Sequence, residues 1–364
     1  MRFLYFSLIC LLASLLTAAN EQQTSHLFDM DTLLTGLEVP WDLEFDSSGT
    51  LYFTERIGRL SRLDNQKKVL ASAESFTNLR VEGEAGLMGL ALDPQFSENN
   101  WLYTCYSAFA DDQRINRVSR FKVTDDVLQD ERIILDNLPG SGAHNGCRLA
   151  FGPDGYLYIS MGEAFNPKLA QDPTYLGGKI LRIASDGTVP EDNPFGNEVW
   201  SLGHRNPQGL VFADDGSLFE TEHGPEANDE INLITRGENY GWPEVTGDAP
   251  NAEFSQALKS YYPDGTIAIA GLDIYRGTMF PWQGNLLFVS LKAGRFYRLE
   301  LTSDKNFKSD EILLDRNINS NLGRLRDVEV APDGSIYLAT SNINDRNNAP
   351  HPDDDRIVRL KPKQ

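Results

Sequence analysis

The chain has few positive charges for its length. Its 364 residues include 33 lysines and arginines against 53 aspartates and glutamates, which gives a formal net charge of −20. A strongly acidic protein repels the phosphates of nucleic acid and the head groups of anionic lipid, so we expect no partner of either kind. The same shortage makes any local cluster of arginine and lysine a candidate for a specific role.

Long apolar runs are absent after the first twenty residues. Met1-Arg2 is followed by an apolar stretch over residues 3–16 and by small residues up to Ala19. These are the three parts of a secretory signal peptide, so residues 1–19 are predicted to be one. The stretch is shorter than the ~20 apolar residues of a comfortable membrane span. The rest of the chain is predicted to be periplasmic or secreted, without membrane insertion.

Cysteine is scarce. Of the three cysteines, Cys10 lies in the predicted signal peptide, which leaves Cys105 and Cys147. In an exported protein these two can form one disulfide. Two buried free thiols also fit the sequence, so both alternatives stay open at this point.

Long amphipathic patterns of helical period are missing, which excludes helical solenoids. Instead the chain repeats a hairpin pattern of an apolar strand, an aspartate-glycine turn and an alternating strand. Two looser copies begin at Ala91 and Phe280, and the four clear copies cover residues 45–55, 151–160, 212–222 and 331–340. A third alternating strand follows most hairpins, as in GRLSRLD from Gly58 and GKILRIASDG from Gly178.

The turn glycines give the length of the repeat. Gly155 and Gly216 are 61 residues apart (216 − 155), and the other intervals give similar or slightly shorter repeats. Repeats of this length made of three or four strands are typical of β-propellers, because one small sheet cannot bury its faces alone. The sequence therefore predicts an all-β fold, a six-bladed β-propeller with four-stranded antiparallel blades. It is expected to form a single domain over residues 20–364.

The loops at one mouth of a propeller converge on its channel, so functional residues are expected at matching places in different blades. Polar residues recur in these loops, at Glu84, His144, Arg205, Asn206, Lys292, Arg324 and Arg326. Each of them alone has a structural explanation, such as a turn histidine or an arginine bound to carbonyl groups. Their recurrence in an acidic chain favours a site for a small polyanionic ligand that reacts by proton abstraction.

A second candidate site follows the fourth hairpin. Gly224-Pro225 offers two adjacent backbone carbonyls, and Asp229 and Glu230 come close behind. Carbonyl and carboxylate oxygens are the ligands that calcium prefers. The segment therefore predicts a calcium site, with an ordinary propeller loop as the alternative.

Nearly the whole chain from Val39 to Pro362 resembles the soluble glucose dehydrogenases and aldose sugar dehydrogenases, quinoproteins that use pyrroloquinoline quinone (PQQ). The matching segments, in the family's order, include GEAGLMGLALDPQF, AHNGCRLAFGPDG, GHRNPQGL, EHGPEANDEINLITRGENYGWP, SLKAG and GRLRDVEVAPDG. The resemblance implies the family's six-bladed propeller and PQQ and Ca²⁺ as cofactors. It also implies oxidation of an aldose sugar at C1 to the lactone, with electrons passed to an external acceptor.

The resemblance implies roles in catalysis or cofactor binding for His144, Arg205 and Asn206. His144 matches the general base, which takes the proton of the anomeric hydroxyl while hydride leaves C1 for the quinone. Arg205 and Asn206 match residues that contact the quinone oxygens, where negative charge grows. His144 and Arg205 are therefore assigned a catalytic role as well as cofactor binding, and Asn206 is assigned cofactor binding.

Cofactor and metal ligands follow in the same way. The cations that pair with the cofactor's carboxylates match Lys292, Arg324 and Arg326, and Glu84 also belongs to the cofactor site. Gly224 and Pro225 match the carbonyls that hold the cofactor-bound calcium. Asp229, Glu230 and Tyr240 belong to a segment that carries additional calcium in some members of the family.

The chain departs from the glucose dehydrogenase branch at three points. Ala143 replaces the aspartate that precedes the base there, so the sequence names no group that orients His144. Glu84 replaces an amide, as in the aldose branch. The longer inserts of the glucose-specific enzymes, including loops tied to dimerisation, are absent, which implies the broader aldose group and a monomer.

Two other functions fit a six-bladed propeller. A non-enzymatic propeller that binds a glycan or a protein at its channel mouth would not require His144 together with Lys292, Arg324 and Arg326. A calcium-dependent lactonase needs convergent carboxylates and asparagines around a channel metal, whereas the candidate cluster is mostly cationic. Because a fold by itself does not specify a function, the choice rests on the motifs, and they favour the aldose dehydrogenase.

Overall fold

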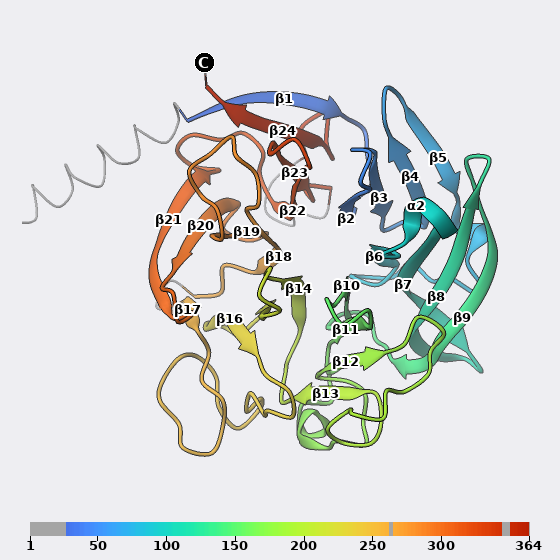
Figure 1. The fold of residues 1–364 in the computed structure, drawn as a ribbon, viewed down its shortest axis with the longest axis vertical. Coiled ribbons are helices and arrows are strands. Elements are labelled where there is room, and N and C mark those ends of the chain that lie inside the picture. Colours follow the sequence, from blue (N-terminus) through green and yellow to red (C-terminus); the bar gives the residue numbers. More distant parts are fainter. Residues whose placement is uncertain (1–26, 262–264, 344–349, 364) are drawn as a thin grey trace, which may run out of the picture.

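A computed structural model describes residues 27–261, 265–343 and 350–363. The predicted signal peptide, residues 1–19, lies outside this part of the chain. Within it, 24 strands form six antiparallel sheets of four strands each, arranged radially around a central axis (Figure 1). The predicted six-bladed propeller with four-stranded blades is confirmed.

Five blades consist of strands that are consecutive in the sequence. Blade one contains β2 (Pro40–Phe45), β3 (Leu51–Glu55), β4 (Arg59–Leu63) and β5 (Lys67–Ala71). Blade two contains β6 (Leu87–Leu92), β7 (Trp101–Ala110), β8 (Gln113–Thr124) and β9 (Val127–Pro139). Blade three contains β10 (Gly146–Phe151), β11 (Leu157–Met161), β12 (Lys179–Ile183) and β13 (Val199–Leu202).

The next two blades follow the same order. Blade four contains β14 (Pro207–Phe212), β15 (Leu218–Glu222), β16 (Asp229–Ile234) and β17 (Lys259–Tyr261). Blade five contains β18 (Ile269–Ile274), β19 (Leu286–Ser290), β20 (Arg295–Leu301) and β21 (Phe307–Asp315). The described helices are short, namely α2 (Phe96–Asn99) and two 3₁₀ turns at Ala73–Ser75 and Pro167–Gln171. None of the described helices has the length and apolarity needed to cross a membrane.

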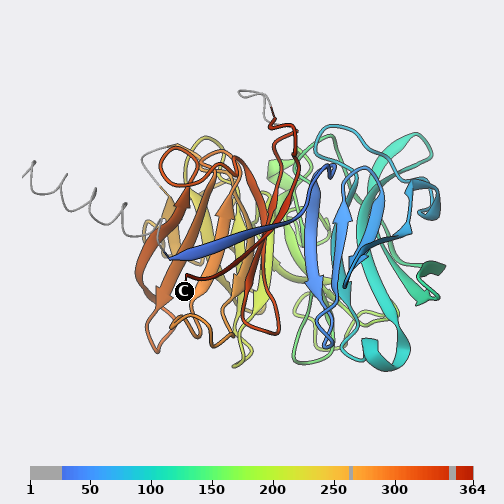
Figure 2. The ribbon, with the colours of Figure 1, turned by 90° about the horizontal axis from the view of Figure 1, so that it is seen from above.

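The sixth blade joins distant parts of the sequence. It contains β22 (Leu325–Val330), β23 (Ile336–Thr340) and β24 (Ile357–Pro362), and its outer strand is β1 (Phe28–Leu34). β1 lies antiparallel to β24, with Phe28 opposite Pro362 and Thr32 opposite Val358 (Figures 1 and 2). These backbone hydrogen bonds close the ring of blades.

The repeated hairpin turns share one side-chain contact. In blade three, Asp154 Oδ1 accepts a hydrogen bond from the backbone N–H of Tyr156 at 3.2 Å. Asp215 and Asp333 make the same bond in blades four and six, at 3.1 and 2.9 Å. The glycine of each turn has a left-handed φ between 79° and 86°, which explains the aspartate-glycine pattern of the repeat.

The hydrophobic core is divided among the blade interfaces. Six clusters of buried side chains lie between neighbouring blades, one at each interface. The cluster between blades two and three contains the disulfide Cys105–Cys147, which links β7 to β10. Of the two alternatives left open by the sequence, the structure therefore has the disulfide.

The inner strands β2, β6, β10, β14, β18 and β22 contact one another around the channel. The residues that precede or begin these strands lie at one mouth of the channel. The far end of the same strands lines a cavity of about 240 Å³ that is rich in carboxylates. The carboxylates in this cavity are Asp42, Glu44, Asp273, Asp327 and Glu329, beside the guanidinium groups of Arg148 and Arg276.

This acidic cavity leads to a prediction about the pH dependence of stability. Burial raises the pKa of Asp42 to about 7 and that of Asp273 to about 6. Between about pH 4 and 7 the folded protein then binds more protons at these groups than the unfolded chain, so its free energy of unfolding falls as the pH rises. Each group contributes at most about 1.4 kcal/mol per pH unit. We expect the melting temperature of the cofactor-free protein to fall from pH 5 to pH 8.

Thermal unfolding at constant ionic strength measures this effect. The variant Glu329→Gln removes one carboxylate of the cavity and should flatten the pH dependence. Glu311→Gln, on β21 and paired with Arg298 at the surface, should leave it unchanged. The same pH dependence in Glu329→Gln and in the unmodified chain would contradict the assignment of the effect to these carboxyl groups.

Candidate active site

A cavity of about 940 Å³ lies at the channel mouth and receives residues from all six blades. Its apolar wall includes Trp41 and Met88, and its charged lining includes Arg56 and Glu84. Of the cations predicted from the sequence, this cavity is lined by Lys292, Arg324 and Arg326. The structure thus brings together residues that lie more than 200 positions apart in the chain.

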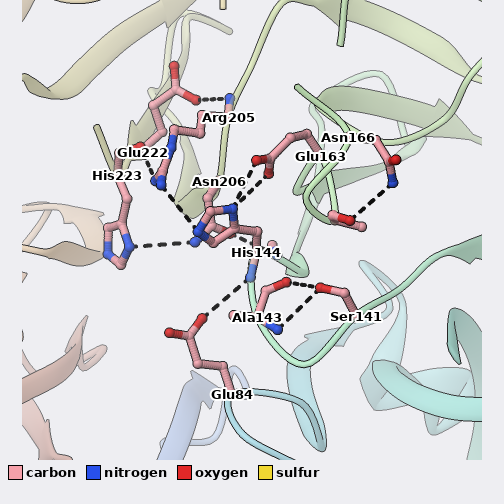
Figure 3. A network of polar contacts seen from close by, with 12 residues as sticks. Glu84, Ser141, Ala143, His144, Glu163, Asn166, Arg205, Asn206, Glu222 and His223 are labelled. Carbon is pink, nitrogen blue, oxygen red and sulfur yellow. Dashed lines mark hydrogen bonds and ion pairs between the residues drawn. The ribbon is translucent and has the colours of Figure 1, made fainter. Parts of the chain in front are cut away.

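His144 lies at the edge of this cavity, between the lining residues Ala143 and Asn145. Its backbone has a left-handed φ of 57°. The side-chain amide of Asn145 holds the loop, since its Oδ1 accepts from Ser141 N and its Nδ2 donates to Ser141 O, each at 3.0 Å. The backbone N–H of His144 points at Glu84 Oε2, 3.4 Å away (Figure 3).

The imidazole of His144 is oriented by Glu163. Nδ1 lies 2.9 and 3.0 Å from the two carboxylate oxygens of Glu163, whose side chain is buried (Figure 3). A carboxylate can only accept, so Nδ1 carries the proton and Nε2 has a lone pair that can accept one. The Phe165 ring lies 4.3 Å from the imidazole and covers one of its faces. The group that the sequence could not name is therefore Glu163.

Arg205 reaches the other side of the imidazole. Its Nη2 lies 3.2 Å from His144 Nε2, and its Nη1 donates to His223 O at 3.1 Å. The guanidinium also lies over the Trp242 ring, at 5.4 Å from its centroid. Asn206 is buried beside it, with its Oδ1 accepting from Gly146 N. Arg205 and Asn206 thus connect blade four, through their side chains, to the loop that carries His144.

The arginines of blade six differ in burial. Arg326 is almost fully buried, donates through Nη2 to Gln208 Oε1 at 2.6 Å and lies over the Trp41 ring. Burial, followed by the nearby Arg148 charge, lowers the pKa of Arg326 to about 9. Arg324 is half-buried and its Nε donates to Ser341 O. Within the described residues Arg326 Nε has no hydrogen-bond partner, so an anionic group in the cavity would stabilise this cation.

The Asp229 side chain stabilises the Gly224-Pro225 turn. Asp229 Oδ1 accepts from Gly224 N at 2.9 Å, and both of its oxygens lie 2.8 Å from Thr266 Oγ1. A Cβ at Gly224 would lie only 2.0 Å from Ala227 O, so the tight turn requires glycine. No described residue donates a hydrogen bond to the carbonyl oxygens of Gly224 or Pro225. Asp229 thus supports the turn, and the two carbonyls are available to a cation.

The remaining predicted metal residues lie in a separate place. Glu230 and Tyr240 line a small cavity of about 10 Å³ together with Gly224, whereas Pro225 lines the large one. The Tyr240 hydroxyl donates to Leu233 O at 2.5 Å and its ring stacks on His204. Its side-chain oxygen is therefore already engaged within blade four.

Sequence reasoning missed several residues of the site. Glu163 lies two positions after the end of β11, as Gly224 does after β15 and Lys292 after β19. This matching position in three blades is the sequence pattern that could have identified Glu163 as a site residue. No comparable sequence pattern indicated Gln208 or Trp41. Gln208 forms hydrogen bonds with both Arg326 and Asn206, and the Trp41 ring packs against the Arg326 guanidinium.

Comparison with known proteins agrees with this geometry. The family model described as Glucose / Sorbosone dehydrogenase matches residues 37–348. The aldose sugar dehydrogenase YliI of Escherichia coli is 32% identical, over 93% of this chain and 95% of that protein. Quinoprotein glucose dehydrogenase B of Acinetobacter calcoaceticus is 28% identical, over 87% of this chain and 86% of that protein.

A solved structure is similar to the same extent. The PQQ-bound form of the aldose sugar dehydrogenase from Streptomyces coelicolor has a TM-score of 0.80 and 31% identity, covering 92% of this chain and 98% of that one. The fold, the residues at the channel mouth and the sequence similarity over most of the chain all indicate the same family. The chain belongs to the glucose/sorbosone dehydrogenase family.

Proposed function

We propose that this protein is a PQQ- and calcium-dependent aldose sugar dehydrogenase, which oxidises an aldose at C1 to the lactone and passes electrons to an external acceptor. The observation that carries the proposal is the position of His144. Its imidazole is held by the buried Glu163 at the rim of a cavity lined by Lys292, Arg324 and Arg326. Membership in a family of sugar dehydrogenases supports the reaction class.

The cavity fits a rigid polyanionic quinone. Its volume of about 940 Å³ exceeds what such a cofactor needs and leaves room for a sugar. Lys292, Arg324 and Arg326 would pair with the cofactor's carboxylates, and the unpartnered Nε of Arg326 is a ready donor. Arg205 and Asn206 would hold the quinone oxygens. When bound, PQQ supplies the acceptor for the hydride that leaves C1.

The carbonyls of Gly224 and Pro225 would hold the calcium ion. They are adjacent, they lie in a turn fixed by Asp229, and Pro225 faces the large cavity. Carbonyl oxygens suit Ca²⁺, and a bound cation polarises a neighbouring oxygen as a Lewis acid. The small cavity with Glu230 and Tyr240 is a candidate for additional calcium, which would there meet the Glu230 carboxylate and backbone oxygens.

His144 would act as the general base through Nε2. Glu163 keeps the imidazole proton on Nδ1, so the Nε2 lone pair can take the proton of the anomeric hydroxyl. Loss of that proton lets the C1 oxygen become the carbonyl oxygen of the lactone. Arg205 Nη2 contacts Nε2 here, so the guanidinium has to turn toward the quinone oxygens as the substrate binds.

We also place the protein outside the cytoplasm, as a monomer. The signal-like sequence at residues 1–19 supports export. The disulfide Cys105–Cys147 supports an oxidising compartment, because such bonds persist mainly there.

Reconstitution tests the proposal. The purified protein is loaded with Ca²⁺, with and without PQQ, and dye reduction is followed with a panel of aldoses. We expect reduction that requires both additions, and the rates rank the sugars. Binding of one quinone per chain without turnover would retain the cofactor site and reject the aldose substrates. Absence of quinone binding would reject the proposed enzyme.

A further inference from the structure

Blade four contains a buried cluster of metal-ligating side chains next to the proposed cofactor site. One ligand atom from each of His204, Glu220 and Glu222 lies within 4.8 Å of the other two, and all three residues are buried. Glu220 and Glu222 are on β15, and His204 lies two positions after the end of β13. The cluster contains none of the carbonyls that would hold the cofactor-bound calcium.

The carboxylates of this cluster are crowded and short of counter-charge. Asn232 Nδ2 lies 3.0 Å from Glu220, 3.3 Å from Glu222 and 3.5 Å from Glu230. One amide has only two N–H groups, so it cannot satisfy three carboxylates. Among the described residues, the only ion-pair contact to the three is His204 Nδ1, at 3.8 Å from Glu222 Oε1.

Blade one provides an internal comparison. Its strand β3 has the sequence LYFTE where β15 has LFETE. Glu55, at the position equivalent to Glu222, is buried but paired with Arg59 at 2.7 Å and Lys67 at 3.0 Å. In blade one the buried carboxylate thus has cationic partners, whereas the buried carboxylates of the cluster in blade four lack them.

Two atoms of the cluster are unpartnered. His204 Nδ1 and Glu220 Oε1 are fully buried and have no hydrogen-bond partner in the part of the chain that the structure describes. The other ring nitrogen, His204 Nε2, lies 2.9 Å from Ser201 Oγ. A histidine that binds a metal usually donates its second N–H to such a partner, which leaves the first lone pair for the ion.

We propose that His204 Nδ1, Glu220 Oε1 and Glu222 Oε1 bind one divalent transition-metal ion of the Zn²⁺ or Mn²⁺ type. An imidazole nitrogen with carboxylate oxygens suits these ions, whereas Ca²⁺ takes oxygen ligands. Ligands at about 2.1 Å in a tetrahedral site lie about 3.4 Å apart, so the side chains have to close by roughly 1 Å. Rotation of the Asn232 amide would add its Oδ1, which is also unpartnered within the described residues, as a fourth ligand.

The ion would hold together the two segments that form one side of the proposed cofactor site. His204 directly precedes Arg205, and Glu222 directly precedes His223 and Gly224. Glu222 Oε2 already accepts from Arg205 N at 2.7 Å, which links the same two segments. Binding of the ion itself does not depend on the proposed function, so it can be tested in protein without quinone.

Metal content and thermal unfolding test the proposal. Tag-free protein is stripped with chelator, dialysed separately against Zn²⁺, Mn²⁺ or Ca²⁺, freed of excess ion and analysed for metal per chain. We expect about one equivalent of Zn²⁺ or Mn²⁺ and a melting temperature raised by roughly 4 °C at an ion concentration 100 times the Kd. Glu220→Gln should abolish both effects, and His204→Gln, which keeps all three carboxylates, should do the same.

Glu55→Gln is the control, since it changes a carboxylate as buried as that of Glu220, at the position of blade one that is equivalent to Glu222. It should retain the metal. The proposal is overturned if the unmodified chain keeps no Zn²⁺ or Mn²⁺, if Glu220→Gln keeps as much as the unmodified chain, or if only Ca²⁺ is retained. If Glu220→Gln fails to fold, the comparison of metal content between the unmodified chain and His204→Gln tests the proposal instead.

Discussion

Replacing His144 by glutamine is expected to lower sugar turnover by about 10²- to 10⁴-fold, the usual contribution of a general base. Glutamine keeps a polar group of similar length but cannot take a proton at neutral pH. Because Lys292, Arg324 and Arg326, the cations proposed to pair with the cofactor's carboxylates, lie on blades five and six, quinone affinity should change little. Single-turnover reduction of bound quinone measures the first effect, and titration of the protein with quinone measures the second.

Glu163 provides the companion variant. Its carboxylate contacts the imidazole at 2.9 Å and lies opposite the nitrogen that would take the proton. Glu163→Gln should lower kcat less than the loss of the base does, with KM for the sugar and quinone affinity nearly unchanged, and Glu163→Asp should restore part of the rate. Full turnover in His144→Gln would contradict the assignment of the base, and a change confined to KM in Glu163→Gln would contradict the positioning role.

Arg326→Met is expected to weaken quinone binding about 10- to 100-fold, because a hydrogen bond to a charged group contributes about 1.5–3 kcal/mol. Arg326 is the buried cation of the cavity, and its Nε has no partner within the described residues. Turnover at saturating quinone should fall much less than affinity. Equilibrium titration followed by fluorescence or by ultrafiltration measures the dissociation constant.

A surface arginine controls for the general loss of positive charge. Arg298→Met, on β20, removes a partly exposed guanidinium that pairs with Glu311 outside the cavity, and it should leave quinone affinity unchanged. Melting curves of both variants show whether the fold is intact. Arg326→Met removes a cation whose pKa is already lowered by burial, so a large drop in melting temperature is not expected. Equal quinone affinity in Arg326→Met and the unmodified chain would remove Arg326 from the cofactor site.

The fold was largely predictable because a propeller repeats itself. The four clear hairpin copies carry a turn aspartate and a turn glycine, and the two looser copies keep the strand pattern, so a local signal appears six times along the chain. The strands predicted after the hairpins, from Gly58 and Gly178, are present as β4 over Arg59–Leu63 and β12 over Lys179–Ile183. The closure of the ring was not predicted. β1 pairs with β24 across more than 300 residues, and no local pattern specifies a partner that far away.

The site was predictable in its chemistry but not in its contacts. Motifs in the loops of blades five and six predicted Lys292, Arg324 and Arg326 as one group of cations, and the structure places all three in the lining of one cavity. They could not place Glu163 against His144, because that contact depends on the path of the loop after β11. Nor could they show that Asp229 supports the Gly224 turn through its side chain.

The sequence alone predicted the number of blades, through its repeated hairpins, and the candidate cofactor residues and the reaction class, through motifs that resemble those of the sugar dehydrogenase family. Only the tertiary structure decided the disulfide, the partner of His144 and the buried cluster of His204, Glu220 and Glu222. The physical reason is that hydrogen bonds and metal ligation depend on distances of about 3 Å between side chains. Residues far apart in the chain reach such distances only when neighbouring blades pack against one another.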